Sequence, residues 1–568
     1  MKTPILLSFT ILFIPNIFSQ NLVSHNRYII YLSDKNNNSF TVQNPQQYLS
    51  ARAIQRRTNQ NLAYNISDLP ITQSYINDIA NTGAKILKKS KWQNFVCVQI
   101  ADSTQLTAIM QLPFVVTNKL VNRVATLSSI QNKIDKFQIE NTVFPTSKIA
   151  KNNITNVIEV DTSISYGASF NQANQIAVDA LHNIGYMGQG IQVAVFDAGF
   201  PNVDTLSTFD SLRMNNRLLG HYNFISDTID VFNSSYNSHG TNTLSCMVAW
   251  TQGQLVGTAP RASYYLFITE YAPSETPYEE VCWLAAAEYA DSLGVDVISS
   301  SLGYTTFDYA ASNYTNADMD GNTTICTKAA DMAASKGILV INSAGNSGAG
   351  SWQIIGAPAD GDSVLSIGAV NENGVRASFS SKGYTADGRI KPDVCAQGAN
   401  TVIAKHTGGF QTGNGTSFSG PVLAGAAACL WQAFPNKTNM EIQGAIKQSA
   451  SQYNSPDSLL GYGIPNFSNA LFLITKTKFN AVGDTKIDNI FPIPFTNELS
   501  IIYHSLDTEK ISLTLCDVYG NTVVSEQFMA TTNSQNIFTC TGLETIAKGI
   551  YIVTIVGKNK RFSQRVVK

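Results

Sequence analysis

The 568-residue chain carries 38 Lys and Arg residues against 40 Asp and Glu residues, a formal net charge of −2 at pH 7. Neither sign forms a long run, which excludes the charge footprint expected of a protein that binds nucleic acid or an anionic membrane. Only 14% of the residues are charged, and the length exceeds what one hydrophobic core usually serves, so we expect an exported protein of several structural units.

The first residues are typical of an export signal. Lys2 supplies a positive charge, an apolar stretch too short to span a bilayer follows, and Ser19 is a small residue at which cleavage is expected. We therefore predict a signal peptide over residues 1–19. No later segment offers about 18 continuous apolar residues, so no transmembrane segment is predicted and the protein is expected to be secreted or held at the cell surface.

Three further units follow from the residue patterns. Residues 20–150 alternate β-rich runs with polar helical stretches, as a small α+β unit does, and the polar residues 151–165 predict a linker. From 166 to 475, apolar strand-like runs alternate with Ala-rich stretches, which predicts an α/β unit with a mostly parallel sheet and helices on both faces. Functional groups in such sheets gather at the carboxyl ends of the strands.

Within this unit the patterns predict five strands and three helices. Strands are expected over 191–197, 263–269, 295–303, 337–346 and 363–370, and helices over 279–293, 327–336 and 422–430. Pro421 is expected early in the last of these helices.

The end of the chain has a different pattern. After a linker predicted over 476–488, residues 489–568 alternate apolar and polar residues between turn signals, which predicts a small antiparallel β-sandwich. The eight cysteines show no CxxC spacing, which argues against a zinc ribbon or redox motif. Cys516 and Cys540, both in this segment, are the first pair to test for a disulfide.

Three residues of the α/β unit have contexts suited to nucleophilic catalysis. Asp197 ends a buried strand, His239 stands in "NSHGTNTLSCMVA" before a helix, and Ser417 has small neighbours in "GNGTSFSGP" that leave its Oγ approachable. Taken singly, each has a structural alternative: a turn or cap for Asp197, a capping or core histidine for His239, and a turn with a helix cap for Ser417.

Together the three contexts carry a resemblance. "VAVFDAGF", "SHGTNTLSCMVA" and "GTSFSGP" occur in the order Asp, His, Ser and resemble the catalytic blocks of the subtilisin-like serine peptidases, the subtilases. The resemblance covers about 166–475 and implies a catalytic triad of Asp197, His239 and Ser417. It departs from the usual pattern at Ala198, where Thr or Ser is commoner, and at Asn242, where a second histidine is often found.

Two neighbouring blocks extend this resemblance. "VINSAGNSG" is similar to the oxyanion block of the family, which implies that Asn346 donates to the oxyanion. "GVDVISSSLG" is similar to the strand that binds substrate beside the primary specificity pocket, which implies substrate-binding roles for Ser301, Leu302 and Gly303.

The resemblance implies a secreted serine endopeptidase that hydrolyses polypeptide substrates through an acyl-enzyme intermediate and requires no cofactor for catalysis. Two alternatives stay open at this point. One is a catalytically silent surface adhesive or binding protein on the same scaffold. The other is a sedolisin-type carboxyl peptidase, which needs a Glu where His239 stands.

The flanking units also resemble known segments. Residues 20–150 are similar to the propeptide region of exported bacterial subtilases, which would inhibit the enzyme until it is cut off; a permanent accessory domain is the alternative. Residues 489–568 look similar to the C-terminal sorting domain of type IX secretion cargo in Bacteroidota, which implies export through the periplasm and contact with that secretion machinery. A sandwich that binds carbohydrate or protein is the alternative.

One acidic stretch suggests a structural metal. In "DMDGNT", Asp318 and Asp320 offer carboxylate oxygens of the kind that Ca²⁺ prefers, and many subtilases are calcium-stabilised. An ordinary turn is the alternative for these residues.

Overall fold

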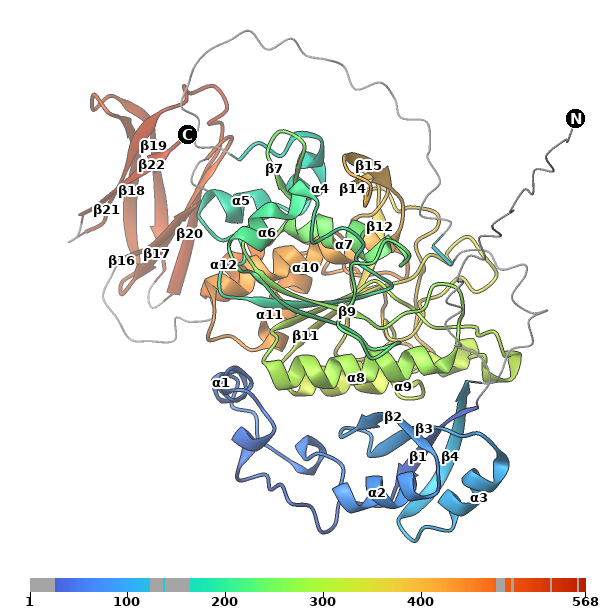
Figure 1. The fold of residues 1–568 in the computed structure, drawn as a ribbon. Helices are drawn as coiled ribbons and strands as arrows, with labels where there is room; N and C mark the ends of the chain where they lie inside the picture. Colours follow the sequence, from blue (N-terminus) through green and yellow to red (C-terminus); the bar gives the residue numbers. More distant parts are fainter. Residues whose placement is uncertain are drawn as a thin grey trace, which may run out of the picture.

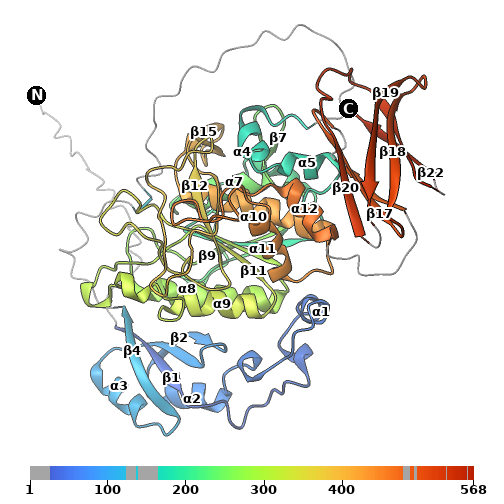
Figure 2. The same ribbon diagram turned by 180° about the vertical axis from the view of Figure 1, so that it is seen from behind.

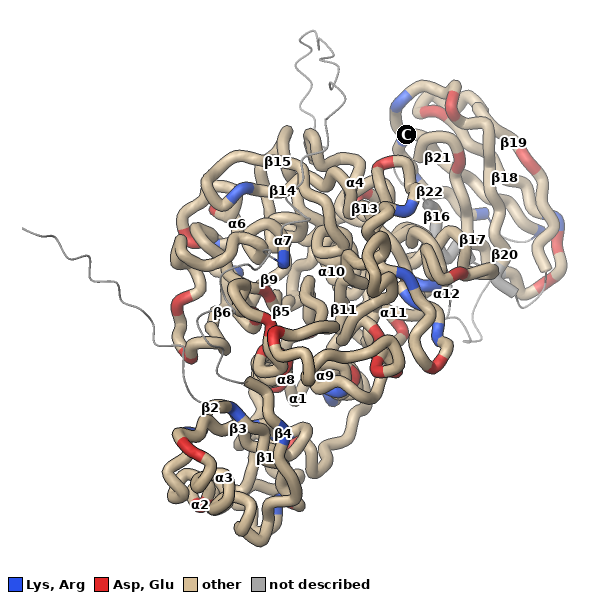
Figure 3. The backbone as a smooth tube through the Cα atoms, turned by 90° about the vertical axis from the view of Figure 1, so that its right-hand side faces the viewer, with Lys and Arg blue, Asp and Glu red and all other residues tan. Residues whose placement is uncertain are grey.

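The computed structural model describes residues 26–122, 136–137, 164–476, 486–491, 495–531, 534–558 and 561–568. The predicted signal peptide and most of the two predicted linkers lie outside these residues. Figure 1 shows an N-terminal unit, a large central unit and a C-terminal unit in chain order. Basic and acidic residues are interspersed along the chain in Figure 3, without a band of one sign. In the described part of the chain, no helix has the length and apolar character needed to cross a membrane.

The N-terminal unit is the predicted α+β unit, built on an antiparallel sheet in the order β2-β3-β1-β4. Its elements are β1 (Arg27–Leu32), α1 (Ala51–Asn59), α2 (Gln73–Asn81), β2 (Lys85–Ser90), β3 (Phe95–Gln99), α3 (Ser103–Met110) and β4 (Val115–Asn122). Alternate residues of a strand face opposite sides of a sheet. Ile30 and Val96 accordingly pack with Ile79 of α2, whereas Ile29 and Phe95 belong to a core shared with the central unit.

The central unit contains a seven-stranded sheet in the order β13-β12-β11-β10-β5-β9-β6, in which every neighbouring pair is parallel. The strands are β5 (Gln192–Asp197), β6 (Leu218–Asn223), β9 (Ser263–Ile268), β10 (Val297–Ser300), β11 (Leu339–Ser343), β12 (Leu365–Val370) and β13 (Val394–Gln397). Two short antiparallel pairs stand apart from it, β7 (Trp250–Thr251) with β8 (Leu255–Val256) and β14 (Thr401–Ala404) with β15 (Phe410–Gly413). The predicted mostly parallel sheet is confirmed.

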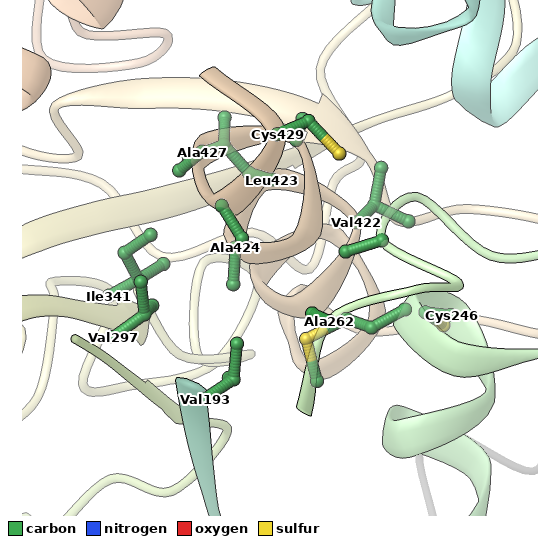
Figure 4. Packing of buried hydrophobic residues seen from close by; sticks show 14 of the residues in the cluster. Val193, Cys246, Ala262, Val297, Ile341, Val422, Leu423, Ala424, Ala427 and Cys429 are labelled. Carbon is green, nitrogen blue, oxygen red and sulfur yellow. The ribbon is translucent and has the colours of Figure 1, made fainter. Parts of the chain in front are cut away.

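Helices cover both faces of this sheet. They are α4 (Phe170–Asn174), α5 (Val178–Asn183), α6 (Asp210–Met214), α7 (His239–Val248), α8 (Pro277–Leu293), α9 (Ile325–Ser335), α10 (Thr416–Ala433), α11 (Asn439–Gln448) and α12 (Phe467–Lys476). Val193 belongs to the same core as Leu423 and Ala424 of α10 (Figure 4), whereas its neighbour Ala194 belongs to the core of α8 and α9. All five predicted strands and three predicted helices occur.

The N-terminal unit lies against α8 and α9 in both Figure 1 and Figure 2. The carboxylate of Glu288 on α8 accepts hydrogen bonds from the Ser90 hydroxyl at 2.7 Å and from the backbone N–H groups of Lys91 and Trp92, both at 3.0 Å. Farther along the helix, buried Asp291 pairs with Arg57 of α1 at 2.8 Å. Hydrogen bonds and ion pairs to the carboxylates of α8 therefore hold the N-terminal unit against the helices on one face of the central sheet.

The C-terminal unit is the predicted antiparallel sandwich, with sheets in the orders β16-β17-β20 and β19-β18-β21-β22. Its strands are β16 (Lys486–Phe491), β17 (Leu499–Ser505), β18 (Glu509–Asp517), β19 (Thr522–Ala530), β20 (Ser534–Cys540), β21 (Ile550–Val556) and β22 (Arg561–Val567). The cysteine pair considered above is not formed, because all eight cysteines are free. Cys516 lies on β18 and Cys540 on β20, so the two belong to different sheets.

A buried histidine makes the stability of the central unit depend on pH. His182 on α5 is 2% exposed, its Nδ1 lies 2.6 Å from the Tyr166 hydroxyl, and its Nε2 lies 3.0 Å from the Thr258 carbonyl. Burial lowers the pKa of His182 to about 4. The unfolded chain therefore binds a proton between pH 6.5 and 4 that the folded chain does not, so this contribution is complete above pH 6.5 and lost as the pH falls.

We expect the Ser417→Ala protein to lose about 3 kcal/mol more of its unfolding free energy between pH 6.5 and pH 4 than the same protein carrying His182→Gln. Both proteins carry the same serine replacement and the same buried carboxyl groups, so the titration of those carboxyl groups cancels in the comparison. Urea unfolding followed by tryptophan fluorescence at each pH measures the difference. Parallel pH profiles for the two proteins would contradict the assignment.

Candidate active site

A carboxylate and an imidazole meet at the carboxyl end of β5. Asp197 is fully buried, and its Oδ1 lies 2.7 Å from Nδ1 of His239, the first residue of α7. The Ala198 N–H donates to the same oxygen at 2.7 Å, and the Thr243 hydroxyl donates to Oδ2 at 2.9 Å. The carboxylate is thus held by the protein while it orients the imidazole.

Glycine after the histidine allows this close approach. A Cβ on Gly240 would lie 2.3 Å from the Gly199 carbonyl oxygen and 2.9 Å from the Asp197 Cβ. The side-chain oxygen of Asn237 accepts the His239 N–H at 2.8 Å and so satisfies one of the unpaired donors at the start of α7. The sequence "NSHG" therefore fixes both the start of the helix and its distance from β5.

Ser417 lies in the first turn of α10 and is 3% exposed. Its hydroxyl donates to the Ser301 carbonyl at 3.4 Å, and its own carbonyl accepts the Ser301 hydroxyl at 2.9 Å. Helix α10 packs against α7, and the ring centroid of Phe418 lies 6.2 Å from that of His239. The helix thereby brings the serine segment beside the Asp197–His239 pair.

Helix α10 begins at Thr416, before the run predicted over 422–430, so Pro421 lies in its interior. An interior proline normally costs stability, since it cannot bond the carbonyl four residues earlier. Here that carbonyl belongs to Ser417, and the Ser301 hydroxyl occupies it. The hydroxyl of Ser301, which follows β10, therefore replaces the backbone hydrogen bond that Pro421 cannot donate.

Asn346 follows β11 and lies against the same helix start. Its Oδ1 accepts the N–H and the hydroxyl of Thr416, both at 2.9 Å. The oxygen and nitrogen of a carboxamide lie on opposite branches of one carbon, so these bonds direct its NH₂ group away from Thr416. The orientation of the amide is set by α10 itself.

The predicted pocket residues extend from the end of β10. Ser301 and Leu302 are buried, Gly303 is exposed, and the Leu302 carbonyl accepts the Asn342 amide at 3.0 Å. The hydrogen bonds between Ser301 and Ser417 place this segment directly beside α10. The predicted residues from β5, β10 and β11 thus gather at the carboxyl edge of the sheet.

Comparison with known proteins identifies the central unit. The model of the "Subtilase family" matches residues 188–463. Subtilisin E from Bacillus subtilis is 31% identical over 310 residues, which cover 54% of this chain and 71% of that protein. The chain belongs to the subtilase family. This subtilase is also 31% identical to a subtilisin from Bacillus pumilus over 295 residues, covering 52% of the chain and 94% of that relative.

The flanking units of the subtilase match their own families. The "Peptidase S8 propeptide domain, Bacteroidota" matches residues 27–137, and the "Secretion system C-terminal sorting domain" matches residues 489–568. The protein is therefore a subtilisin-like serine endopeptidase that is made as a zymogen. Its sorting domain implies the type IX secretion machinery as a partner and a secreted or surface-attached location.

Sequence reasoning missed a contact made by the last two residues of the matched propeptide. The ring of Phe137 stacks on that of His239, with centroids 4.1 Å apart and planes 23° apart. Beside it, the Lys136 ammonium contacts Glu270, Glu275 and Glu279. The run "TEYAPSETPYEE" at 269–280 was the available signal, because it concentrates glutamates just after a strand of the sheet.

Hydrogen bonds within a turn engage both carboxylates of the suggested calcium site. The Asp318 carboxylate accepts the N–H and hydroxyl of Thr315 at 2.6 and 2.7 Å, and Asp320 accepts two N–H groups and the Thr323 hydroxyl. These bonds account for the two residues as parts of a turn. A structural Ca²⁺ at Asp318 and Asp320 stays a prediction.

If Ca²⁺ binds at this turn, EDTA should lower the melting temperature of the Ser417→Ala protein, and Asp320→Asn should remove most of that effect. A ligand present at 100 times its dissociation constant stabilises the folded state by about 2.7 kcal/mol. Differential scanning calorimetry with and without EDTA measures the shift. An unchanged melting temperature in the presence of EDTA would count against the site.

Proposed function

We propose that this subtilase cleaves peptide bonds with Ser417 as nucleophile, His239 as general base and acid, and Asp197 as the group that orients the imidazole. The observation that carries the proposal is the buried Asp197–His239 pair, 2.7 Å between Oδ1 and Nδ1, at the sheet edge where α10 presents Ser417. No cofactor takes part, because side chains supply the nucleophile and both proton-transfer roles.

The reaction follows from these positions. Ser417 Oγ attacks the substrate carbonyl while His239 Nε2 takes its proton, and the Asp197 carboxylate stabilises the imidazolium that forms. The imidazolium then gives the proton to the leaving amine, which leaves an acyl group on Ser417. A water molecule, activated by His239, hydrolyses this acyl-enzyme and restores the serine.

Two donors are suited to the negative charge that develops on the carbonyl oxygen. The N–H of Ser417 belongs to the first turn of α10, where helix N–H groups lack partners within the helix and the helix dipole favours an anion. The Asn346 NH₂ group is the second donor, held by the two bonds from Thr416 to its oxygen. The segment Ser301–Gly303 binds substrate beside them.

The N-terminal unit inhibits this site until it is removed. Phe137 covers one face of the His239 imidazole and is only 8% exposed, and Lys136 is anchored beside it. A substrate that must reach His239 meets these residues first. We retain the boundaries 20–150 for this unit, 166–475 for the catalytic unit and 489–568 for the sorting unit as part of the proposal. Sequencing the amino terminus of the mature enzyme tests where the first is cut.

A fluorophosphonate probe tests the proposed chemistry, because it modifies a serine only when a neighbouring base activates it. Enzyme matured from the full-length chain should be labelled at Ser417, as located by peptide mass spectrometry. The Ser417→Ala and His239→Ala proteins should not be labelled. A silent adhesive on this scaffold would show no labelling in any of the three proteins, and that result would overturn the proposal.

A further inference from the structure

Three glutamates form a compact anionic cluster next to the active-site histidine. Glu270 follows β9, Glu275 precedes α8, and Glu279 lies in the first turn of α8. Each offers a carboxylate oxygen, and these oxygens lie within 4.8 Å of one another. Glu270 and Glu279 are buried, and Glu275 is half-buried. Among the described residues, these three glutamates are the group of His, Cys, Asp or Glu side chains whose ligand atoms lie close enough together to hold a cation.

The fold holds the cluster in place without help from the N-terminal unit. The Glu279 carboxylate accepts the N–H groups of Thr276 at 2.6 Å and Tyr271 at 2.9 Å, as part of the capping of α8. The Glu270 carboxylate accepts the Tyr304 hydroxyl at 2.9 Å. These bonds lie entirely within the catalytic unit, so the anionic cluster is built into the enzyme that remains after the propeptide has left.

One ammonium group now occupies the cluster. Lys136 Nζ contacts Glu270, lies 3.0 Å from Glu275 and 3.4 Å from Glu279, and donates to the Ser274 carbonyl at 2.9 Å. Burial alone would lower the pKa of Lys136, but the carboxylates outweigh it and the pKa is raised. Burial raises the pKa of Glu279 to about 7 even with Lys136 present. Closely spaced buried carboxylates favour a cation between them.

The residue after this lysine lies on the catalytic imidazole. Phe137 stacks on His239, so two consecutive side chains of one polypeptide enter the glutamate cluster and cover the histidine. A cavity of about 230 Å³ beside Lys136, lined in part by Glu275, Phe307 and Asp308, leaves room for a longer basic side chain. The propeptide thus shows how a substrate polypeptide can bind at the same place.

We infer that Glu270, Glu275 and Glu279 form a substrate subsite for a lysine or arginine side chain that directly precedes a residue packed on His239. The inference rests on the proposed function and gives it a substrate class, polypeptides with a basic residue followed by an aromatic or apolar one. When the propeptide leaves, the Lys136 ammonium leaves with it, and the substrate's basic side chain takes its position.

Three internally quenched peptides test the subsite. One has the sequence of residues 131–142, which includes Lys136 and Phe137; the others carry norleucine or glutamate in place of Lys136, and all three keep Lys133. We expect the mature enzyme to cleave the lysine peptide with a kcat/KM roughly 10- to 150-fold above that of the norleucine peptide, because a charged hydrogen-bonded pair contributes on that scale. The glutamate peptide should be the poorest substrate.

Variants of the cluster separate its charge from its structural role. Glu275→Gln is the first choice, because the Glu275 carboxylate accepts a hydrogen bond from Lys136. Glu270→Gln is the second, since a glutamine oxygen still accepts the Tyr304 hydroxyl. Both should reduce the preference for lysine over norleucine, measured as the ratio of the two kcat/KM values, by about tenfold. Glu372→Gln, at an exposed residue, is the matched control and should keep the full preference.

The outcomes separate this inference from the proposed function. Equal cleavage of the lysine and norleucine peptides by an enzyme that the fluorophosphonate labels would overturn the subsite and leave the catalytic proposal standing. Loss of the lysine preference on addition of 1 mM Ca²⁺, roughly an extracellular level, would identify a metal site and overturn the subsite. Failure to cleave any peptide together with absent labelling would remove both proposals.

Discussion

Replacement of Ser417 with alanine is expected to lower kcat by a factor on the order of 10⁶, the cost that the same loss has in subtilisin. The replacement removes the atom that we propose forms the acyl bond, together with the hydrogen bond from the Ser417 hydroxyl to the Ser301 carbonyl. The Ser301 hydroxyl still bonds the carbonyl of residue 417, so α10 should start at the same place. Residual hydrolysis would come from the oxyanion donors and substrate binding alone.

Processing of the chain gives a second measure of the same variant. If the enzyme cuts its own propeptide, the Ser417→Ala protein should accumulate at full length, and mass spectrometry should find residues 27–137 still attached. Ser419→Ala is the matched control, because its hydroxyl bonds the Thr416 carbonyl within the same helix turn at 3.1 Å. It should retain activity within about tenfold. A Ser417→Ala protein that cleaves peptides near the wild-type rate would rule out Ser417 as nucleophile.

Local patterns were enough to predict the sheet and to select the candidate catalytic residues that the fold brings to one edge of it. The apolar run ending at Asp197 could only be a buried strand, and a parallel sheet places the ends of its strands at one edge. The glycine after His239 and the small residues around Ser417 are local requirements for close packing, so they too are visible in sequence. These features depend on neighbours in the chain, which a single sequence displays.

The errors arose where a distant residue decides the local structure. The apolar run predicted a helix only from residue 422, whereas α10 begins at Thr416 and continues through Pro421. The Ser301 hydroxyl, 116 positions from Ser417, bonds the carbonyl that the proline leaves open. Cys516 and Cys540 are near in sequence, yet the strand order puts them on different sheets. Likewise, Lys136 meets Glu270 across 134 positions, a contact that no local pattern contains.

Asn346→Ala is expected to lower kcat by about 10² to 10³, or 2.7–4 kcal/mol of transition-state stabilisation, with little change in KM. In the proposed mechanism the charge on the carbonyl oxygen develops only as Ser417 attacks, so a donor aimed at that charge acts on the transition state more than on bound substrate. Steady-state kinetics on the lysine peptide described above measure both constants.

The alanine variant also loses the bonds from Thr416 to Asn346 Oδ1, so a second pair of variants must separate the two roles. Asn346→Asp keeps an oxygen for Thr416 but places a negative charge where the NH₂ group stood, and should lower kcat at least as far as alanine does. Thr416→Val removes one bond to the Asn346 oxygen and leaves the amide in place, and should cost no more than about tenfold. If Asn346 had only a structural role, its hydrogen bond to Thr416 would be the contact that activity requires. Asn346→Asp would then keep most of kcat, and Thr416→Val would lower kcat more than Asn346→Asp does.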